Sequence, residues 1–223
     1  MAETDTTLSN FALSIVGGAI QADYPWIDDY EADAGTNGTL KWCQILLPRA
    51  RTHIQSRFGW QRLREFAEPG DALATESANT VPGYSYCFDR PSGCLVFTGV
   101  VCDTVNVETG ELTYYPFLEV GEQIACNYGE EILFEYTAAN TDPDTWGEPL
   151  FQATGHYLAL LLSRPMGASP EVQSYIRQLY AQAYADATAD AAKERYYHKK
   201  YDPLKKYRVP GATIRAGLLY PRG

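Results

Sequence analysis

The stretch Thr39–Trp60, TLKWCQILLPRARTHIQSRFGW, decides the fold class, because a helical pattern ends within it and a strand pattern begins after it. Its apolar residues recur at steps of three or four and therefore share one face of a helix. They are Leu40, Cys43, Leu47, Ala50, Ile54 and Phe58. Pro48 interrupts this pattern, which predicts either a kink near Gln44–Pro48 or two abutting helices. After Trp60 the helical period is lost.

Five arginines lie in and just after this stretch, away from the apolar stripe. They are Arg49, Arg51, Arg57, Arg62 and Arg64. The simplest interpretation is a solvated face, and a basic contact surface is the alternative.

Beyond Trp60, short runs rich in Tyr, Phe, Val and Cys alternate with Gly, Pro, Asn and Ser, which is typical of strands. Strands are predicted near 61–67, 84–88, 95–103, 114–119, 123–127 and 131–136. Turn residues at 108–111 and 120–122 favour antiparallel hairpins. We therefore expect one small, strongly twisted antiparallel sheet.

Helices are predicted on both sides of these strands. The first spans 8–17 and stops at Gly17-Gly18, and an acidic surface loop follows at 21–38. The third begins at Asp142-Pro143 and ends near Arg164, because Asp142 can cap and Pro165 cannot continue a helix. The last begins at Ser169-Pro170 and reaches at least Tyr196. Its predicted apolar face contains Val172, Tyr175, Ile176, Leu179, Ala183 and Ala187.

The predicted fold class is α+β, a four-helix body (bundle) with an antiparallel β-sheet insertion between helices 2 and 3 and an extended C-terminal tail. The predicted divisions are residues 1–60 for the first two helices, 61–137 for the β insertion, 138–200 for the last two helices and 201–223 for the tail.

Charge is distributed unevenly along the chain. Residues 1–192 carry 26 acidic and 9 basic side chains, net −17, whereas residues 193–223 carry 2 and 9, net +7. The acidic body should repel nucleic acid, and the basic tail should bind an acidic partner or phosphate. Because the tail is rich in proline and has no helical stripe, we expect it to be extended or unfolded when alone. We expect a partner to order it, and a passive disordered end is the alternative.

Several function classes find no support in the sequence. The five cysteines form no C-x-x-C pair and read as small buried hydrophobes, and the three histidines share no ligand spacing. No motif of a hydrolase, zinc protease, P-loop or dinucleotide site is present, so we predict a non-enzyme without cofactor or metal. Acids at Glu130, Glu131 and Glu135 read as the wet face of a strand. The longest apolar runs are too short to cross a membrane, and the acidic start is not a secretory signal.

Several phrases resemble the tail tubular protein A family, the head-to-tail adaptors of short-tailed phages. The most specific is Gly83–Leu95, GYSYCFDRPSGCL, which resembles that family's tyrosine-rich strand followed by a Pro-x-x-Cys-Leu turn. Others are similar in the same order along 8–195. They are Phe11–Gly17, Phe58-Gly59-Trp60 with Phe66-Ala67, Glu122-Gln123-Ile124, Leu133–Tyr136, Asp142–Phe151 and Tyr157–Ser163 with Pro165-Met166.

This resemblance implies a homo-oligomeric ring, usually dodecameric, that joins the portal of a phage virion to a tail nozzle of the tail tubular protein B kind. Tail fibres are further possible partners, genome DNA would pass through the lumen without specific binding, and no membrane is involved. The expected location is the neck of the virion, after assembly in the host cytoplasm.

Two sets of contact residues are predicted. The portal-contact tail contains Lys205, Lys206, Tyr207, Arg208, Arg215, Leu218, Leu219, Tyr220 and Arg222. The subunit interface contains Tyr175, Tyr180 and Tyr184, because tyrosine is enriched at interfaces. The alternative function is a nucleic-acid-binding protein that uses the basic C-terminal tail.

Overall fold

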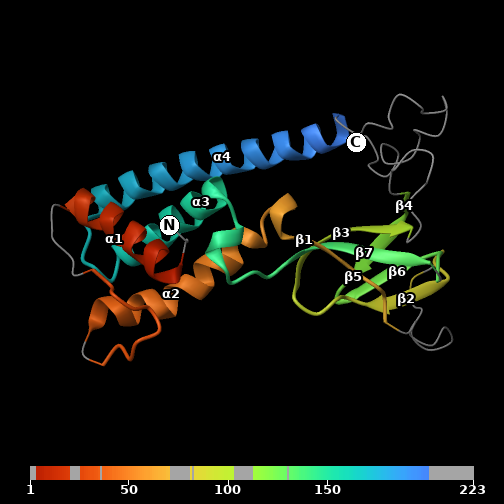
Figure 1. The fold of residues 1–223 in the computed structure, drawn as a ribbon, viewed down its shortest axis with the longest axis horizontal. Helices are drawn as coiled ribbons and strands as arrows, with labels where there is room; N and C mark the ends of the chain where they lie inside the picture. The colour runs from red at the N-terminus through yellow and green to blue at the C-terminus, as the bar shows by residue number, and fades with distance from the viewer. Residues whose placement is uncertain are drawn as a thin grey trace. The chain divides into compact units, whose positions relative to one another are not determined.

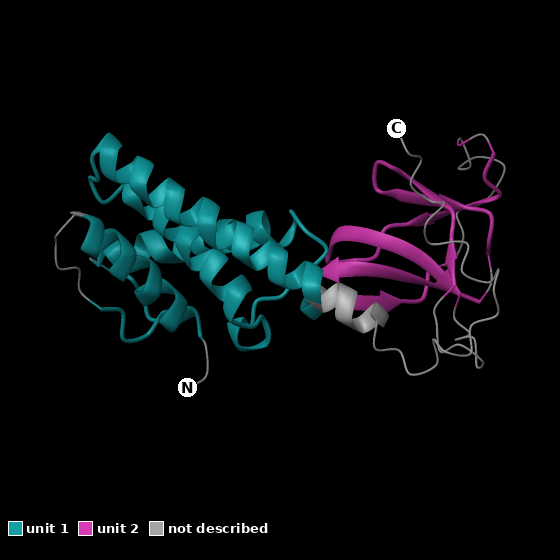
Figure 2. Cartoon of the chain, turned by 90° about the horizontal axis from the view of Figure 1, so that it is seen from above, with its two compact units in different colours: residues 1–63, 139–194 teal, residues 64–138, 195–223 magenta. Residues whose placement is uncertain are grey.

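The computed structural model describes residues 4–20, 26–35, 37–70, 81, 83–102, 113–129 and 131–200. These residues form a mixed α and β structure with four α-helices and two antiparallel sheets (Figure 1). Two compact units are distinguished (Figure 2). The helical unit comprises Met1–Leu63 and Ala139–Glu194, and the β unit contains Arg64–Ala138, which holds the described strands.

The first helix, α1, spans Asp5–Ile20 and is longer than predicted at both ends. A reciprocal cap begins it, because Thr4 Oγ1 accepts a hydrogen bond from the Thr7 N–H at 3.2 Å and Thr7 Oγ1 accepts one from the Thr4 N–H at 2.7 Å. The predicted stop at Gly17-Gly18 is wrong. A glycine inside a helix costs only about 1 kcal/mol relative to alanine, and burial of the apolar stripe outweighs it. The fully buried stripe residues are Leu8, Ala12 and Val16.

The second helix, α2, spans Gly38–Gln55, and the side chain of Asn37 caps it by accepting from the Leu40 N–H at 3.1 Å. It passes through Pro48 as one helix, so the prediction of two abutting helices is wrong. Pro48 is exposed, and buried residues on both sides of it keep the helix against the core. The predicted apolar face is confirmed at Leu40, Cys43, Leu47, Ala50 and Ile54.

The predicted start of the third helix is a separate short turn. Asp142 and Pro143 open the 3-10 helix η2, Pro143–Thr145, in which Asp142 Oδ1 accepts from the Asp144 N–H at 3.2 Å. Gly147 then has φ of 76°, which a right-handed helix does not contain. The helix α3 therefore begins after it and spans Glu148–Ser163.

The last helix, α4, spans Pro170–Lys200. Its inward face differs in part from the predicted one, because Tyr175 is 52% exposed while Ile176 is fully buried. Tyr180 and Tyr184 follow Ile176 at steps of four and are half-buried. Tyr175 lies one residue off this row, so the helix turns its side chain about 100° away from the core.

All four helices contribute to one buried cluster. Helices α1 and α2 both pack against α3. The segment before η2 is tied to the end of α2, because the Gln55 side chain donates to Asn140 O at 2.8 Å and accepts from the Asn140 N–H at 3.1 Å. Trp146, 1% exposed, donates its indole N–H to Asn140 Oδ1 at 3.2 Å. The two hydrogen bonds between Gln55 and Asn140 therefore hold the segment before η2 against the end of α2.

The prediction of a single sheet is wrong. The strands are β1 Arg64–Ala67, β2 Tyr86–Asp89, β3 Cys94–Cys102, β4 Tyr114–Tyr115, β5 Phe117–Val120, β6 Gln123–Cys126 and β7 Ile132–Ala138. One sheet has the order β1-β7-β3-β4 and the other β2-β6-β5. Each sheet contains strands that are distant in sequence, so local patterns could not show which strand belongs to which sheet. Gln61–Leu63, predicted as strand, is a 3-10 turn, η1.

The predicted turn at 120–122 is confirmed, because β5 and β6 form a hairpin in which Gly121 has φ of 63°. The predicted turn at 108–111 lies outside the described residues.

Aromatic rings from both sheets share the core of the β unit. Phe134 of β7 lies edge-on to Phe88 of β2 at 5.6 Å and to Phe97 of β3 at 5.3 Å between ring centroids. Phe97 in turn lies 5.1 Å from Phe117 of β5. The two sheets are therefore held together by rings in the favourable edge-to-face arrangement.

Candidate interaction surfaces

A row of five aromatic rings, four half-buried and one buried, lies on α2, on the segment that follows it, on α3 and on α4. His53 of α2 stacks on Tyr157 of α3 at 4.2 Å, and Tyr157 contacts Tyr180 of α4 at 5.0 Å. Tyr180 lies 5.9 Å from Tyr184, which meets the buried Trp60 edge-on at 6.5 Å. We call these five residues the aromatic row. Its four half-buried rings combine apolar faces with polar tips, a combination enriched at protein interfaces.

The environment of the row shifts two of its titrating groups. Burial, with the nearby Arg57 charge, lowers the pKa of His53 below its ordinary value of 6.5. Burial raises the pKa of Tyr180, and the neighbouring Tyr184 adds to that rise. At neutral pH His53 and Tyr180 are therefore uncharged, which lowers the cost of covering them with a partner.

The three tyrosines predicted as a subunit interface fall in two places. Tyr180 and Tyr184 belong to the aromatic row and pack against the core of the helical unit. Tyr175 is exposed on α4 outside the row. Two of the three therefore lie together, and the third offers a separate exposed ring.

A second surface, which the sequence analysis missed, lies on α2. Trp42 and Ile45 are 42% and 40% exposed, one helical turn apart, and Arg49 follows one turn later. We call these three residues the α2 ridge. The available signal was that Trp42 and Ile45 are apolar yet lie off the buried stripe of Leu40 and Cys43. An exposed tryptophan beside an arginine is a composition typical of interface hot spots.

The arginines of this region do not form one exposed face. Arg49, Arg57 and Arg62 are exposed. Arg51 is 9% exposed, forms an ion pair with Asp5 and lies over the Trp146 ring at 5.8 Å, so the expectation of a solvated or basic surface is wrong there. Arg64 belongs to β1. Of the five, Arg49 and Arg57 are exposed and can contact a partner.

The described part of the acidic loop, 26–35, is fastened to the helices. The Asn10 side chain donates to Ile27 O at 2.8 Å and accepts from the Ile27 N–H at 2.9 Å. Gln44 of α2 donates to the carbonyls of Tyr30 at 2.7 Å and Ala32 at 2.9 Å. The acids that this arrangement leaves exposed are Asp28, Asp29, Glu31 and Asp33. A fixed cluster of negative charge is thereby displayed by the helical unit.

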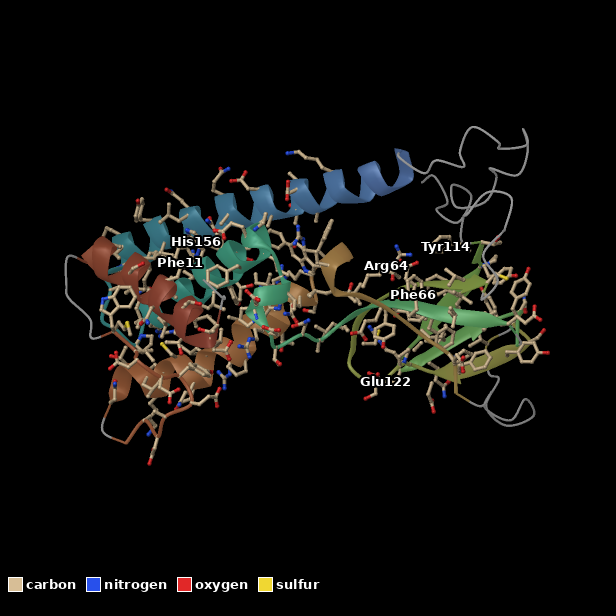
Figure 3. All side chains as sticks on the ribbon, in the orientation of Figure 1. Phe11, Arg64, Phe66, Tyr114, Glu122 and His156 are labelled. Atoms are coloured by element: carbon tan, nitrogen blue, oxygen red, sulfur yellow. The ribbon has the colours of Figure 1, made fainter. Side chains whose placement is uncertain are left out.

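In the β unit, Glu135 lies against Arg64 on the face of β7 opposite the aromatic core. Figure 3 shows Arg64 beside Phe66 and Tyr114. The Arg64 Nε lies 2.7 Å from Glu135 Oε1, and the guanidinium also donates to the Tyr114 hydroxyl at 3.2 Å and lies 4.7 Å from the Phe66 ring centroid. Glu135 is 3% exposed, so interpreting it as part of a wet strand face was wrong. This cluster neutralises a buried charge inside the β unit.

The nine portal-contact residues between Lys205 and Arg222 lie outside the described residues. Burial raises the pKa of the Cys43 thiol to about 12, so this cysteine stays protonated at neutral pH. Among the residues that the structure describes, no group of three or more His, Cys, Asp and Glu side chains is arranged to hold a metal ion.

A small hollow in the helical unit is lined in part by Trp60, Trp146 and Asp190. It has room for about one water molecule. Within the described part of the chain, no helix is both long and apolar enough to cross a membrane.

Comparison with models of known protein families gave no match, and comparison with curated proteins gave no similar sequence.

Proposed function

We propose that this chain is a structural adaptor of a tailed phage, a homo-oligomeric ring protein that joins the portal to the tail nozzle and forms part of the DNA channel. In this proposal the four helices form a bundle-like body, the strands form an insertion between α2 and α3, and the tail after Lys200 contacts the portal. Its location is the neck of the virion, with tail fibres as further partners.

The observation that carries this proposal is the order of elements around the strands. Two helices precede the described strands, two follow them, and the helices of both pairs share one core. The phrases that resemble the tail tubular protein A family fall on these elements in the same order. Gly83–Leu95 covers β2 and the start of β3. Phe58-Gly59-Trp60 lies between the end of α2 at Gln55 and η1.

The surfaces of the helical unit support assembly with other copies. A ring is built from two different surfaces of each subunit that fit one another. The helical unit offers the α2 ridge and the aromatic row, together with exposed acids at 28–33 and exposed bases at Arg49 and Arg57. Apolar rings surrounded by charges of both signs are typical of protein interfaces.

The charge distribution supports a channel through which DNA slides. The net charge of −17 on residues 1–192 opposes tight binding of phosphate, because DNA affinity depends on cationic contacts.

The decisive test is assembly. Full-length protein is incubated with portal rings and imaged by electron microscopy, and a ring added to one face of the portal is expected. A variant that lacks 203–223 should fail to add. If the full-length chain does not associate, the adaptor proposal is wrong, and if the truncated chain associates equally well, the portal contact does not involve the tail.

A nucleic-acid-binding protein is the second candidate, and the net charge of +7 on residues 193–223 favours it. It requires duplex DNA binding that falls steeply as salt rises. Binding at low and moderate salt, with and without 203–223, separates the candidates, because tail-dependent binding without portal association supports this function alone.

A further inference from the structure

The outer edge of β5 carries two exposed apolar side chains that the proposed adaptor role does not use. Leu118 and Val120 are 43% and 41% exposed and point to the same face, because they are two residues apart on a strand. Glu119 points to the opposite face, and its Oε2 lies 3.6 Å from Arg90 Nη1. The strand β5 is the last of its sheet, next to β6 only.

The backbone of β5 has hydrogen-bonding groups directed away from its sheet. Val120 and Gln123 face each other across the two-residue turn, so their backbone groups form hydrogen bonds with each other. Leu118 and its partner Ala125, the next pair but one, do the same. The N–H and C=O groups of Phe117 and Glu119 therefore point outward. Among the described residues, β5 pairs with a strand on its β6 side alone. A free edge of this kind is a template for another strand.

The chain itself contains a segment that fits this edge. Lys206-Tyr207-Arg208-Val209 alternates basic and apolar residues, as a strand with two different faces does, and it is as long as β5. Pro210 follows and prevents a longer strand. Added to β5, its apolar residues would lie beside Leu118 and Val120, and its basic residues beside Glu119.

Charge favours the same pairing. Residues 64–138 contain 13 acidic and 2 basic side chains, net −11, whereas residues 193–223 have a net charge of +7. Glu119 and Glu122 are exposed at this edge. Opposite charges on neighbouring strands stabilise their pairing, and the net fields draw the two segments together.

We propose that the segment 206–209 of one copy of this chain adds as a strand to the β5 edge of a second copy. This proposal assigns Lys206, Tyr207 and Arg208 to β5, and it leaves the predicted portal-contact residues beyond Pro210 to the portal. The proposal goes beyond the adaptor function and can hold or fail independently of it.

The first experiment measures binding of a fluorescent peptide with the sequence of 202–212 to the full-length protein by anisotropy. We expect saturable binding that weakens about tenfold or more in the Leu118→Lys/Val120→Lys variant, because two apolar contacts are lost and like charges meet. Phe66→Lys is the matched control, since Phe66 is equally exposed on β1, the edge of the other sheet. It should bind as the original protein does.

A second peptide separates strand addition from simple charge attraction. Tyr207→Pro keeps every charge but removes a backbone donor and disfavours pairing, so its binding should be about tenfold weaker. Equal binding of this peptide, or unchanged binding to the Leu118→Lys/Val120→Lys variant, overturns the proposal. If that variant is misfolded by circular dichroism, Leu118→Ser/Val120→Ser tests the same contact.

The third experiment tests which copy supplies the tail. A photo-reactive phenylalanine replaces Tyr207 in the full-length chain, and isotopically light and heavy chains are mixed before irradiation. Mass spectrometry should find residue 207 joined to 117–120 in light–heavy pairs. Cross-links that join only residues of the same isotope would show that each tail occupies its own chain and would contradict the exchange between copies.

Discussion

The helical unit and the β unit hold themselves together by different kinds of contact. In the helical unit, mostly aliphatic stripes from four helices meet, with Trp60 and Trp146 between them. In the β unit, Phe88, Phe97 and Phe134 carry the core between two sheets. The first core is built from residues three or four apart in sequence. The second depends on pairing between distant strands, so single changes should affect the two units differently.

The largest expected effect is in the aromatic core. Phe134→Ala removes a fully buried ring that contacts both Phe88 and Phe97, and we expect a loss of about 3–5 kcal/mol in the free energy of unfolding. Phe66→Ala, at a ring that is 43% exposed, should cost about 1 kcal/mol or less. Denaturant unfolding of both variants measures the difference. Equal losses would show that the shared ring cluster does not dominate the β unit.

The next effect concerns the ion pair of the β unit. Arg64→Met leaves Glu135, only 3% exposed, without its counter-charge and should cost about 3 kcal/mol. Combining it with Glu135→Gln should recover most of that loss, because no buried charge remains. The same denaturant series measures this double-mutant cycle. A loss in the double variant equal to the sum of the single losses would mean that the two side chains act independently.

In the helical unit, two glycine-to-alanine substitutions give the sharpest test. A Cβ at Gly155 of α3 would lie 2.3 Å from a ring carbon of Phe11, which is held between Phe151 and His156, as Figure 3 shows for His156. Gly155→Ala should therefore cost about 2 kcal/mol by overpacking. Gly18→Ala in α1 meets no atom within 4 Å and should instead stabilise by about 1 kcal/mol. Thermal unfolding tests both, and a stabilised Gly155→Ala would contradict the close approach of α1 and α3.

The smallest expected effect is a pH dependence confined to the helical unit, because residues 64–138 contain no histidine. The pKa of His53 is lowered in the folded state by burial and by Arg57. The unfolded state therefore binds the proton more readily, and stability falls as pH drops below about 6.5. Unfolding between pH 7.5 and 5.5 should show a smaller loss in His53→Gln. A pH dependence unchanged by this substitution would assign the titration to another group.

Part of this organisation could be predicted from the sequence. The stripe of α2, the cap at Asp142, the start signal at Ser169 and the hairpin at Gly121 depend on residues close in sequence, so their spacing reveals them. The candidate surfaces were less accessible. Trp42 and Ile45 stood out only as apolar residues off the stripe, and Tyr175 could not be separated from Tyr180 until the direction of α4 was known.

The sequence by itself determined that helices flank a region of strands, which face of α2 is apolar, and that acidic and basic residues are segregated along the chain. These are properties of local spacing and composition. Only the tertiary structure decided that the strands form two sheets, that Arg51 and Glu135 are buried beside opposite charges, and that α1 continues through two glycines. Each of these depends on contacts between residues far apart in the chain, whose free energy outweighs local preference.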